Sequence, residues 1–410
     1  MSHQQTSDVT QLTECVACGC SKPKLVLDLG KQPLANSFKL KCDDVQEEYP
    51  LAINRCEECF HVQLTHSVDP RLMFEDYLYV SGTAQTMHEH FKDFASMVKK
   101  DSSWPHTPTV LDVGCNDGTQ LDYFKELGFT TYGVDPAANL HTESSKKHTI
   151  WCDWFNKDFA DKCDVGSFDV ITAQNVFAHG PNPLEFLQTA KELLTDDGVL
   201  YIQTSQANMI KNNEFDTIYH EHISFFNTLS MMRLCVRAGL CLYDVEYMPI
   251  HGTSYIFKIS KQFRSGNVYN IIAQENAEGL FTPETYVKYA KRCDEIVEAL
   301  KWEVAKYTRS EVGWLGVGYG APAKGMTLLN YSGLKLDFII DDNPLKQGRF
   351  TPGSSIPIYP ASKLDEHQDA LCFVPLAWNF FDEIVDKIKK RRNNSWDRFI
   401  TYFPKVETKE

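Results

Sequence analysis

The strongest acid–base signal in the sequence is a short run between residues 214 and 226, in which Tyr219, His220, Glu221 and His222 are consecutive. A histidine titrates near neutral pH, a neighbouring glutamate can orient its ring, and a tyrosine hydroxyl can donate to a developing oxyanion. A metal site is one alternative, but the run has no evident distant third ligand and no HExxH pattern. A solvated polar loop is another. The residue types favour an acid–base cluster.

Two CxxC motifs near the N-terminus form the second candidate site. Cys15 and Cys18 make the first pair, Cys56 and Cys59 make the second, and 37 residues separate the two pairs. Two such pairs can surround one tetrahedral zinc ion and leave no position open for water, which is typical of a structural metal. Four unconnected cysteines are the alternative, and a thioredoxin-like redox motif would need only one pair. We expect one structural Zn²⁺.

A glycine turn at residues 114–118, which we call the donor turn, marks the third candidate site. The apolar run 109–113 leads into it, a helix is expected at 119–127, and a strand at 131–134 ends at Asp135. Strand, glycine turn and helix form the first unit of a doubly wound sheet. A dinucleotide would need GxGxxG, and Asp117 would repel its pyrophosphate, whereas a carboxylate is favourable near a sulfonium. We therefore expect S-adenosylmethionine, held by Asp112, Gly114, Asn116, Asp117, Asp135, Pro136 and Asn175.

Further elements must carry these residues. A strand at 168–173 precedes Asn175 and His179, and the ends of parallel strands face a ligand crevice. Further segments complete an expected seven-stranded domain: a helix at 85–99, a strand at 198–203, a helix at 228–238, and strands at 241–248 and 253–259. Tyr77 and Tyr79 lie two residues apart and would share one face of an extended segment.

The C-terminal part repeats the central plan. An amphipathic helix is expected from Pro283, followed by a strand at 312–317, a glycine turn at 318–325 and a strand at 337–340 that ends in acidic residues. This pattern predicts a second α/β unit and suggests a duplication. Lys324 in its turn suits a phosphate, and a purely structural turn is the alternative.

Composition excludes several classes of protein. The chain has 410 residues, and 41 Lys and Arg against 55 Asp and Glu give a formal net charge of −14. This balance argues against nucleic-acid binding, although local loops can still bind one small anion. The N-terminus lacks a signal-peptide pattern, and no apolar run reaches the roughly 18 residues of a membrane helix. We expect a cytoplasmic protein of two or three domains, monomeric or a small homo-oligomer, without membrane or nucleic-acid partners.

Together, these motifs resemble the nucleotide-sugar C-methyltransferase family, in particular the enzymes that act at C-3′ of dTDP-linked 3-amino-4-keto sugars. The resemblance covers nearly the whole chain and rests on the paired CxxC motifs and on four segments: Gln32-Pro33-Leu34-Ala35-Asn36, Gly114-Cys115-Asn116-Asp117-Gly118, Tyr219-His220-Glu221-His222, and Gly318 through Gly325. It implies an α/β protein with a zinc-binding domain at 1–75, a class I (Rossmann-like) S-adenosylmethionine methyltransferase domain at 76–265 and a Rossmann-like α/β domain at 266–410.

The resemblance also implies roles for site residues. His222 would be the general base that removes the proton alpha to the C-4 ketone of a dTDP-linked deoxysugar, with C-3′ as the methylated carbon. Glu221 and Tyr219 would support it, and His179 and Tyr79 would lie near the sugar. The residues implied to bind the substrate are Tyr77, Lys324, Gly320 and Gly318.

Two alternatives stay open. The family pattern often has Gly-Gly-Ser and then a basic residue after the sixth strand, where this chain has His251-Gly252-Thr253-Ser254. Methylation of an oxygen or nitrogen of a related nucleotide sugar is therefore one alternative. A non-catalytic zinc-ribbon binding protein with degenerate transferase domains is the other, and the intact Asp117, Asp135 and His222 argue against it.

Overall fold

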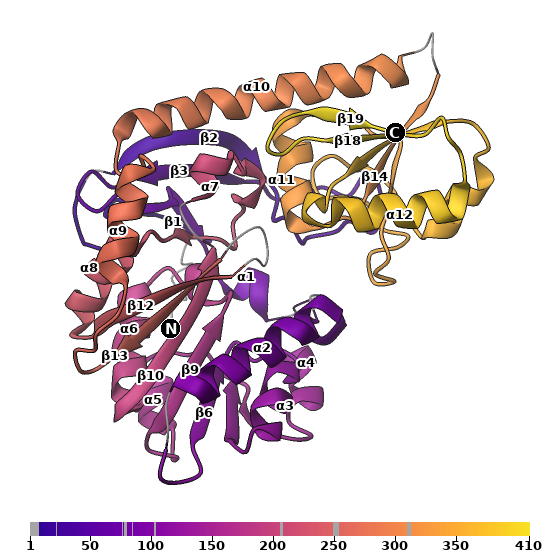
Figure 1. Cartoon of the computed structure of the whole chain (residues 1–410). Helices are drawn as coiled ribbons and strands as arrows, with labels where there is room; N and C mark the ends of the chain where they lie inside the picture. The colour runs from indigo at the N-terminus through magenta and orange to yellow at the C-terminus, as the bar shows by residue number, and fades with distance from the viewer. Residues whose placement is uncertain are drawn as a thin grey trace, which may run out of the picture.

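The structure is a computed structural model of the chain (Figure 1). It describes residues 8–21, 23–75, 77, 80–83, 85–101, 104–205, 208–248, 254–309 and 313–410. Within these ranges the strands form sheets of two, four, six and seven strands. No helix in the described part of the chain combines the length and the apolar composition that crossing a bilayer requires.

The seven-stranded sheet is the Rossmann-like sheet predicted for the centre of the chain. Its order is β12-β13-β10-β9-β6-β7-β8, with β13 antiparallel to both neighbours and the other pairings parallel. The strands are β6 (Thr109–Val113), β7 (Thr130–Val134), β8 (Thr149–Trp151), β9 (Phe168–Gln174), β10 (Leu194–Ser205), β12 (Cys241–Met248) and β13 (Ser254–Ser260). The order reverses between β6 and β9, so a ligand crevice is expected at their carboxyl ends.

Helices cover both faces of this sheet, which explains why its strands are apolar runs rather than alternating ones. On β10, Val199 and Tyr201 pack toward one face, and Leu200 and Ile202 toward the other. The first face is covered by α2 (Gln85–Asp101) and α3 (Thr119–Glu126). The second is covered by α5 (Lys157–Lys162), α6 (Pro183–Leu193) and α8 (Thr228–Ala238).

The N-terminal sheet takes one of its strands from the 214–226 run. Its order is β11-β4-β3-β2, from β2 (Lys24–Gln32), β3 (Tyr49–Arg55), β4 (Val62–Leu64) and β11 (Ser224–Phe225). Ser224 pairs with Gln63 and Phe225 with Val62. A separate two-stranded sheet joins β1 (Val9–Gln11) to β5 (His66–Val68). The run predicted to do chemistry is thus attached to a sheet that lies far from it in the sequence.

The predicted second α/β unit is present and is called the C-terminal unit below. Its sheet has the order β16-β15-β14-β17-β18-β19, parallel except for β19. The strands are β14 (Leu315–Tyr319), β15 (Phe338–Ile340), β16 (Ile358–Tyr359), β17 (Leu371–Pro375), β18 (Arg398–Thr401) and β19 (Glu407–Lys409), and the helices are α10 (Pro283–Thr308), α11 (Ala323–Ser332) and α12 (Phe381–Arg392). Its strand order reverses between β14 and β17, so a second ligand crevice is expected at the carboxyl ends of these strands.

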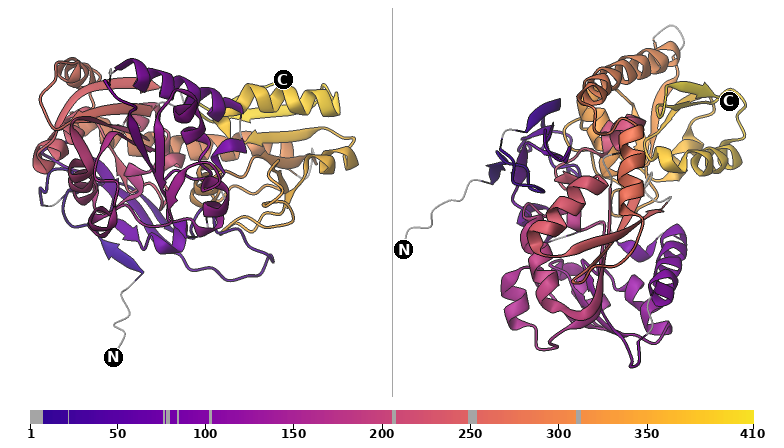
Figure 2. Two further views of the ribbon diagram at one scale, coloured as in Figure 1. Left: turned by 90° about the horizontal axis from the view of Figure 1, so that it is seen from below. Right: turned by 60° about the vertical axis from the view of Figure 1, so that its left-hand side comes forward.

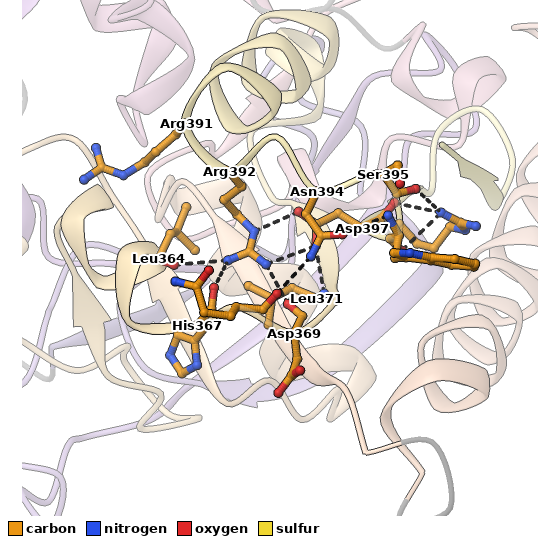
Figure 3. Close-up of polar contacts among 12 residues, drawn as sticks. Leu364, His367, Asp369, Leu371, Arg391, Arg392, Asn394, Ser395 and Asp397 are labelled. Carbon is orange, nitrogen blue, oxygen red and sulfur yellow. Dashed lines mark hydrogen bonds and ion pairs between the residues drawn. The ribbon is translucent and has the colours of Figure 1, made fainter.

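A buried ion pair holds the loops of the C-terminal unit (Figure 3). The side chains of Arg392 and Asp397 are both 3% exposed and lie 2.8 Å apart. The guanidinium also donates to the carbonyl oxygens of Leu364, His367 and Asp369, and Asp397 accepts from the backbone amide of Leu371. Because the pair is well supplied with hydrogen bonds, its burial is tolerated, and it fixes the approach to β17.

One hydrophobic core unites the outer parts of the molecule. It joins residues of β2, β3 and β4, of the 214–226 run, of α10 and of the C-terminal sheet, among them Leu29, Ile53, Phe215, Leu300 and Val374. Helix α10 runs along the top of both outer sheets in Figure 1, and the right-hand view of Figure 2 shows these sheets on the same side of the central sheet. We propose domain boundaries after residues 75 and 265, which fall between β5 and β6 and between β13 and β14, with β11 crossing from the central part of the chain into the N-terminal sheet.

Candidate active site

A cavity of about 1410 Å³ lies where the carboxyl ends of the central strands face the loops of the C-terminal unit. It is larger than the 300–1,000 Å³ or so of most single-ligand pockets, so it has room for two ligands. Predicted site residues from several parts of the chain line it: Tyr77, Gly114, Asn116, Asp135, Pro136, Asn175, His179, Tyr219, Glu221, His222 and Lys324. Asn36, Lys346 and Trp378, which were not predicted to act here, line it as well.

The donor turn requires glycine at its first position. Gly114 has φ +71°, and a Cβ placed there would lie 2.3 Å from Cγ2 of Val176. Asp135, at the end of β7, accepts hydrogen bonds from the amides of Asn116 and Ala137, each at 2.8 Å. Burial raises the pKa of this carboxyl group above its usual value. The acidic residue thus ties the two loops of the crevice together beside the cavity.

Two of the residues predicted to bind S-adenosylmethionine, Asp117 and Asp112, are not part of the cavity wall. Asp117 accepts from the amides of Gly82 at 2.9 Å and Thr119 at 3.1 Å, so it holds the segment before α2 over the donor turn. Asp112 accepts from the Thr172 hydroxyl at 2.7 Å, and burial raises its pKa to about 7. Both carboxylates already accept hydrogen bonds from groups of the protein. Direct contact of either one with a donor molecule stays a prediction.

His222 is held in one tautomer. Its Nδ1 lies 2.9 Å from the carbonyl oxygen of Thr217, which can only accept, so Nδ1 carries the proton in the neutral ring. Nε2 then accepts from the Tyr219 hydroxyl at 2.8 Å. His222 is 8% exposed and lines the cavity. The arrangement leaves the basic Nε2 facing the tyrosine hydroxyl on a side chain that lines the cavity.

Glu221 does not provide the orienting contact that was expected of it. Its Oε1 accepts from Asn36 at 2.5 Å and its Oε2 from the Tyr77 hydroxyl at 3.3 Å. Burial raises its pKa to about 7, and the Lys346 ammonium partly opposes this rise. The orienting role belongs to the Thr217 carbonyl, which no side-chain pattern could have indicated. Glu221 instead joins the N-terminal segment to the cavity wall.

His179 lies in the cavity wall within an aromatic stack. Its ring is 5.5 Å from that of Phe74 with an interplanar angle of 4°, and 5.2 Å from that of His222 at 24°. Burial lowers its pKa to about 4, so it is neutral at physiological pH. His179 therefore lies beside His222 in the cavity wall, and its expected place near a sugar stays a prediction.

The C-terminal unit contributes two lysines, Lys324 and Lys346, to the cavity lining. Lys324 lies in the first turn of α11, with its ammonium 5.3 Å from the centre of the Trp378 ring. Gly318 and Gly320 do not line the cavity. Gly318 lies within β14, so the turn expected at 318–325 begins only after Tyr319; a Cβ on Gly318 would lie 2.8 Å from Ile339 of the neighbouring strand, and Gly320, with φ +82°, lies in the turn itself.

The acidic end of β15 repeats the bonding of Asp135. Asp341 accepts from the amides of Ala321 at 2.6 Å and Asn343 at 2.8 Å. Like Asp135, it therefore ties the loop after a glycine turn to the loop after the neighbouring strand. This likeness agrees with the suggested duplication.

Two sets of predicted residues lie outside the described ranges. Tyr79 is one, so its expected place near a sugar stays a prediction. The residues 251–253, which carry the departure from the family pattern, are the other.

The four predicted cysteines converge. Their sulfur atoms all lie within 4.8 Å of one another, with Cys15 to Cys59 at 3.6 Å and Cys18 to Cys56 at 3.5 Å. Four sulfurs at about 2.3 Å from a tetrahedral ion would be separated by about 3.8 Å, so the set fits zinc. The site also supports the 214–226 run, because Asn227 donates to the carbonyl oxygens of Cys59 and Phe60.

Comparison with known proteins gives matches along most of the chain. The C-methyltransferase NovU of Streptomyces niveus is 30% identical over 412 residues, covering 97% of this chain and 96% of NovU. A ubiquinone biosynthesis O-methyltransferase of Glaesserella parasuis is 35% identical over 104 residues, which covers 23% of this chain and 44% of that protein. Sequence profiles match three regions: a zinc binding domain at 15–74, a methyltransferase domain at 79–245 and a C-methyltransferase C-terminal domain at 249–404.

Proposed function

Because the chain belongs to the C-methyltransferase family that includes NovU, we propose that it methylates a dTDP-linked 4-keto-deoxysugar at C-3′, the carbon alpha to the ketone. The observation that carries this proposal is the geometry of His222, whose Nδ1 is bonded to the Thr217 carbonyl and whose Nε2 faces a tyrosine hydroxyl in a two-ligand cavity. Membership of the family makes the chain a methyltransferase, and this removes the non-catalytic alternative.

S-adenosylmethionine is the methyl donor, and the cavity residues of the central sheet fit it. Gly114 allows close approach of the backbone, and Asn116, Asp135, Pro136 and Asn175 surround the same crevice. When bound, the donor supplies an electrophilic methyl group on a sulfonium. A zinc ion held by the four cysteines would be structural, because protein sulfurs would take all four positions around it.

His222 and Tyr219 perform the proton chemistry in this proposal. His222 accepts the alpha proton at Nε2, while Nδ1 keeps its bond to Thr217 and so stabilises the imidazolium that forms. The Tyr219 hydroxyl lies 2.8 Å from that nitrogen in the free enzyme, and in this proposal it leaves Nε2 when the substrate binds and donates instead to the developing enolate oxygen. A positioned base contributes about 10²–10⁴-fold to the rate, and one oxyanion donor about 10²–10³-fold.

The sugar nucleotide occupies the other half of the cavity. Lys324 and Lys346 bring positive charge to the side formed by the C-terminal unit, where a diphosphate would be favourable. Tyr77 and His179 border the side nearest His222, where the sugar belongs. Two lysines at the cavity support binding of one small anionic substrate by a chain with a net charge of −14, although Asp342 lines the same side.

Methylation on oxygen or nitrogen makes a different prediction from methylation on carbon. Only carbon methylation requires removal of a C–H proton, so the enzyme should exchange the C-3′ hydrogen of a dTDP-4-keto sugar for deuterium in D₂O. We expect a methylated product whose new carbon NMR assigns to C-3′, and loss of both exchange and methylation in His222→Asn. Methylation without exchange, or undiminished in His222→Asn, would contradict the proposal.

A further inference from the structure

Three consecutive residues before the base are each fixed by a different contact. In the turn 216–218, Asp216 Oδ2 accepts from the indole Nε1 of Trp378 at 2.8 Å, and the Ile218 carbonyl accepts from the Thr327 hydroxyl at 3.1 Å. Between them, the Thr217 carbonyl accepts from Nδ1 of His222. These three turn residues are at most 3% exposed.

Both outer contacts come from the C-terminal unit. Trp378 opens the 3₁₀ turn Trp378–Phe380 beyond β17, and Thr327 lies in α11. Trp378 also lines the cavity, and its ring face lies 5.3 Å from the Lys324 ammonium. One indole therefore contacts the turn that orients the base and the lysine assigned to the substrate.

The buried carboxylate of Asp216 depends strongly on the hydrogen bond from the Trp378 indole. It is fully buried, and its Oδ1 has no hydrogen-bond partner within the described part of the chain. Burial raises its pKa to about 7, while the positive charge of Lys324 and the bond from Trp378 oppose that rise. A buried carboxylate with so few donors is costly unless each bond is kept.

We propose that Trp378 and Thr327 are positioning residues for the reaction: they hold the turn 216–218 so that the Thr217 carbonyl keeps His222 in its basic tautomer and aimed into the cavity. The inference rests on the proposed role of His222 as the base. It assigns to the C-terminal unit a part in the chemistry in addition to substrate binding. Displacement of a reacting group by about 1 Å can cost about 10²-fold in rate, so small shifts of this turn matter.

The test compares Trp378→Phe and Thr327→Val with matched controls. Trp378→Phe removes the Nε1 donor and keeps a ring near Lys324, and Trp396→Phe makes the same change at an exposed position. Thr308→Val matches Thr327→Val, since the Thr308 hydroxyl also donates to a backbone carbonyl, within α10. We expect kcat to fall about 10- to 100-fold in the two test variants, with KM for the donor unchanged, and neither control to change kcat.

Substitution of Asp216 separates positioning from general loss of structure. Asp216→Asn keeps an acceptor for the indole and should retain most of the activity, whereas Asp216→Leu should match Trp378→Phe. Because both remove the same bond, the double variant Asp216→Leu/Trp378→Phe should be no slower than either single variant. Wild-type kcat in Trp378→Phe and Thr327→Val, additive losses, or equal losses in Asp216→Asn and Asp216→Leu would overturn the inference.

Two measurements keep the result interpretable. Binding of S-adenosylmethionine and thermal unfolding show whether each variant is folded. If Trp378→Phe does not fold, Thr327→Val serves as the second test. If His222→Asn retains full activity, the proposed function itself fails. If His222→Asn is inactive and both test variants are fully active, only the positioning role fails.

Discussion

His222 and Thr217 are joined by a bond of 2.9 Å from the ring Nδ1 to the backbone carbonyl, across five residues of one segment. Because a carbonyl cannot donate, this bond selects the tautomer in which Nε2 is the base. A side-chain carboxylate in the same place would add a negative charge to a buried site. The backbone performs the orientation without that charge.

Tyr219→Phe tests the other bond of the imidazole. The substitution removes the hydroxyl that donates to Nε2 at 2.8 Å but leaves the ring beside His222. We expect kcat to fall about 10²-fold, since one hydrogen bond to the oxyanion is lost. KM for S-adenosylmethionine should change little. Steady-state kinetics with a dTDP-4-keto sugar measure both. An unchanged kcat would exclude a part for the hydroxyl in the slow step.

Gly114→Ala tests the donor crevice. Gly114 and Gly128 both have positive φ, +71° and +85°, but a Cβ at 114 would lie 2.3 Å from Val176, whereas one at 128 meets nothing within 4 Å. Both variants carry the cost of the backbone conformation, and only the first disturbs the donor turn. We expect calorimetric titration with S-adenosylmethionine to show at least about tenfold weaker binding in Gly114→Ala alone, a cost of about 1.4 kcal/mol. Equal weakening in both variants would contradict the assignment.

Asp112→Asn tests the effect of a buried carboxyl group on stability. Burial raises the pKa of Asp112 to about 7 in the folded chain, above the value of about 3.9 expected when unfolded. The folded state therefore binds the proton more tightly, and this contribution is complete below pH 4 and is lost as the pH rises toward 7. Its slope is about 1.4 kcal/mol per pH unit at most.

The measurement is urea unfolding at pH 5 and at pH 7. Wild type should lose more stability between the two than Asp112→Asn does, while Asp382→Asn, at an exposed position, should follow wild type. The difference between variants is the relevant quantity, because neutral buried histidines such as His179 change stability in the opposite direction. Parallel curves for wild type and Asp112→Asn would show that its pKa is not raised.

Cys56→Ser tests the metal site. Its sulfur lies 3.5 Å from that of Cys18, within the four-cysteine cluster. We expect elemental analysis to find about one zinc per wild-type chain and less than half of that in the variant. Activity should fall as well, because Asn227 and β11 lose their support. Cys42→Ser, at an exposed cysteine outside the cluster, should retain zinc and activity.

Local patterns predicted the elements whose signals are contiguous. The helix expected at 228–238 is present with those ends, because Asn227 caps its start and Gly239, at φ +69°, ends it. The strand expected at 198–203 instead begins at Leu194, directly after α6. The strand expected at 312–317 begins at Leu315, just beyond Gly313, which has φ +74°.

Long-range pairing explains what the sequence did not predict. Strand β11 has only two residues and exists because β4 lies beside it. Trp378 reaches Asp216 from 162 residues away, and Asn36 reaches Glu221 from 185 residues away. The residue types of the site were readable, but the partner of each side chain depended on how three sheets pack.

The 214–226 run has consequences for engineering, because the N-terminal sheet, the central domain and the C-terminal unit each contact it at a different residue. β4 pairs with its end, the Ala178 carbonyl accepts from the Ile223 amide, and Thr327 donates to Ile218. A chimera that exchanges whole domains between family members would therefore place this run against non-native partners at three contacts within a few residues of the base. In such a chimera, the run should be transferred together with Asn36, Thr327 and Trp378 from the same parent. The residues of the donor crevice can then come from the other parent.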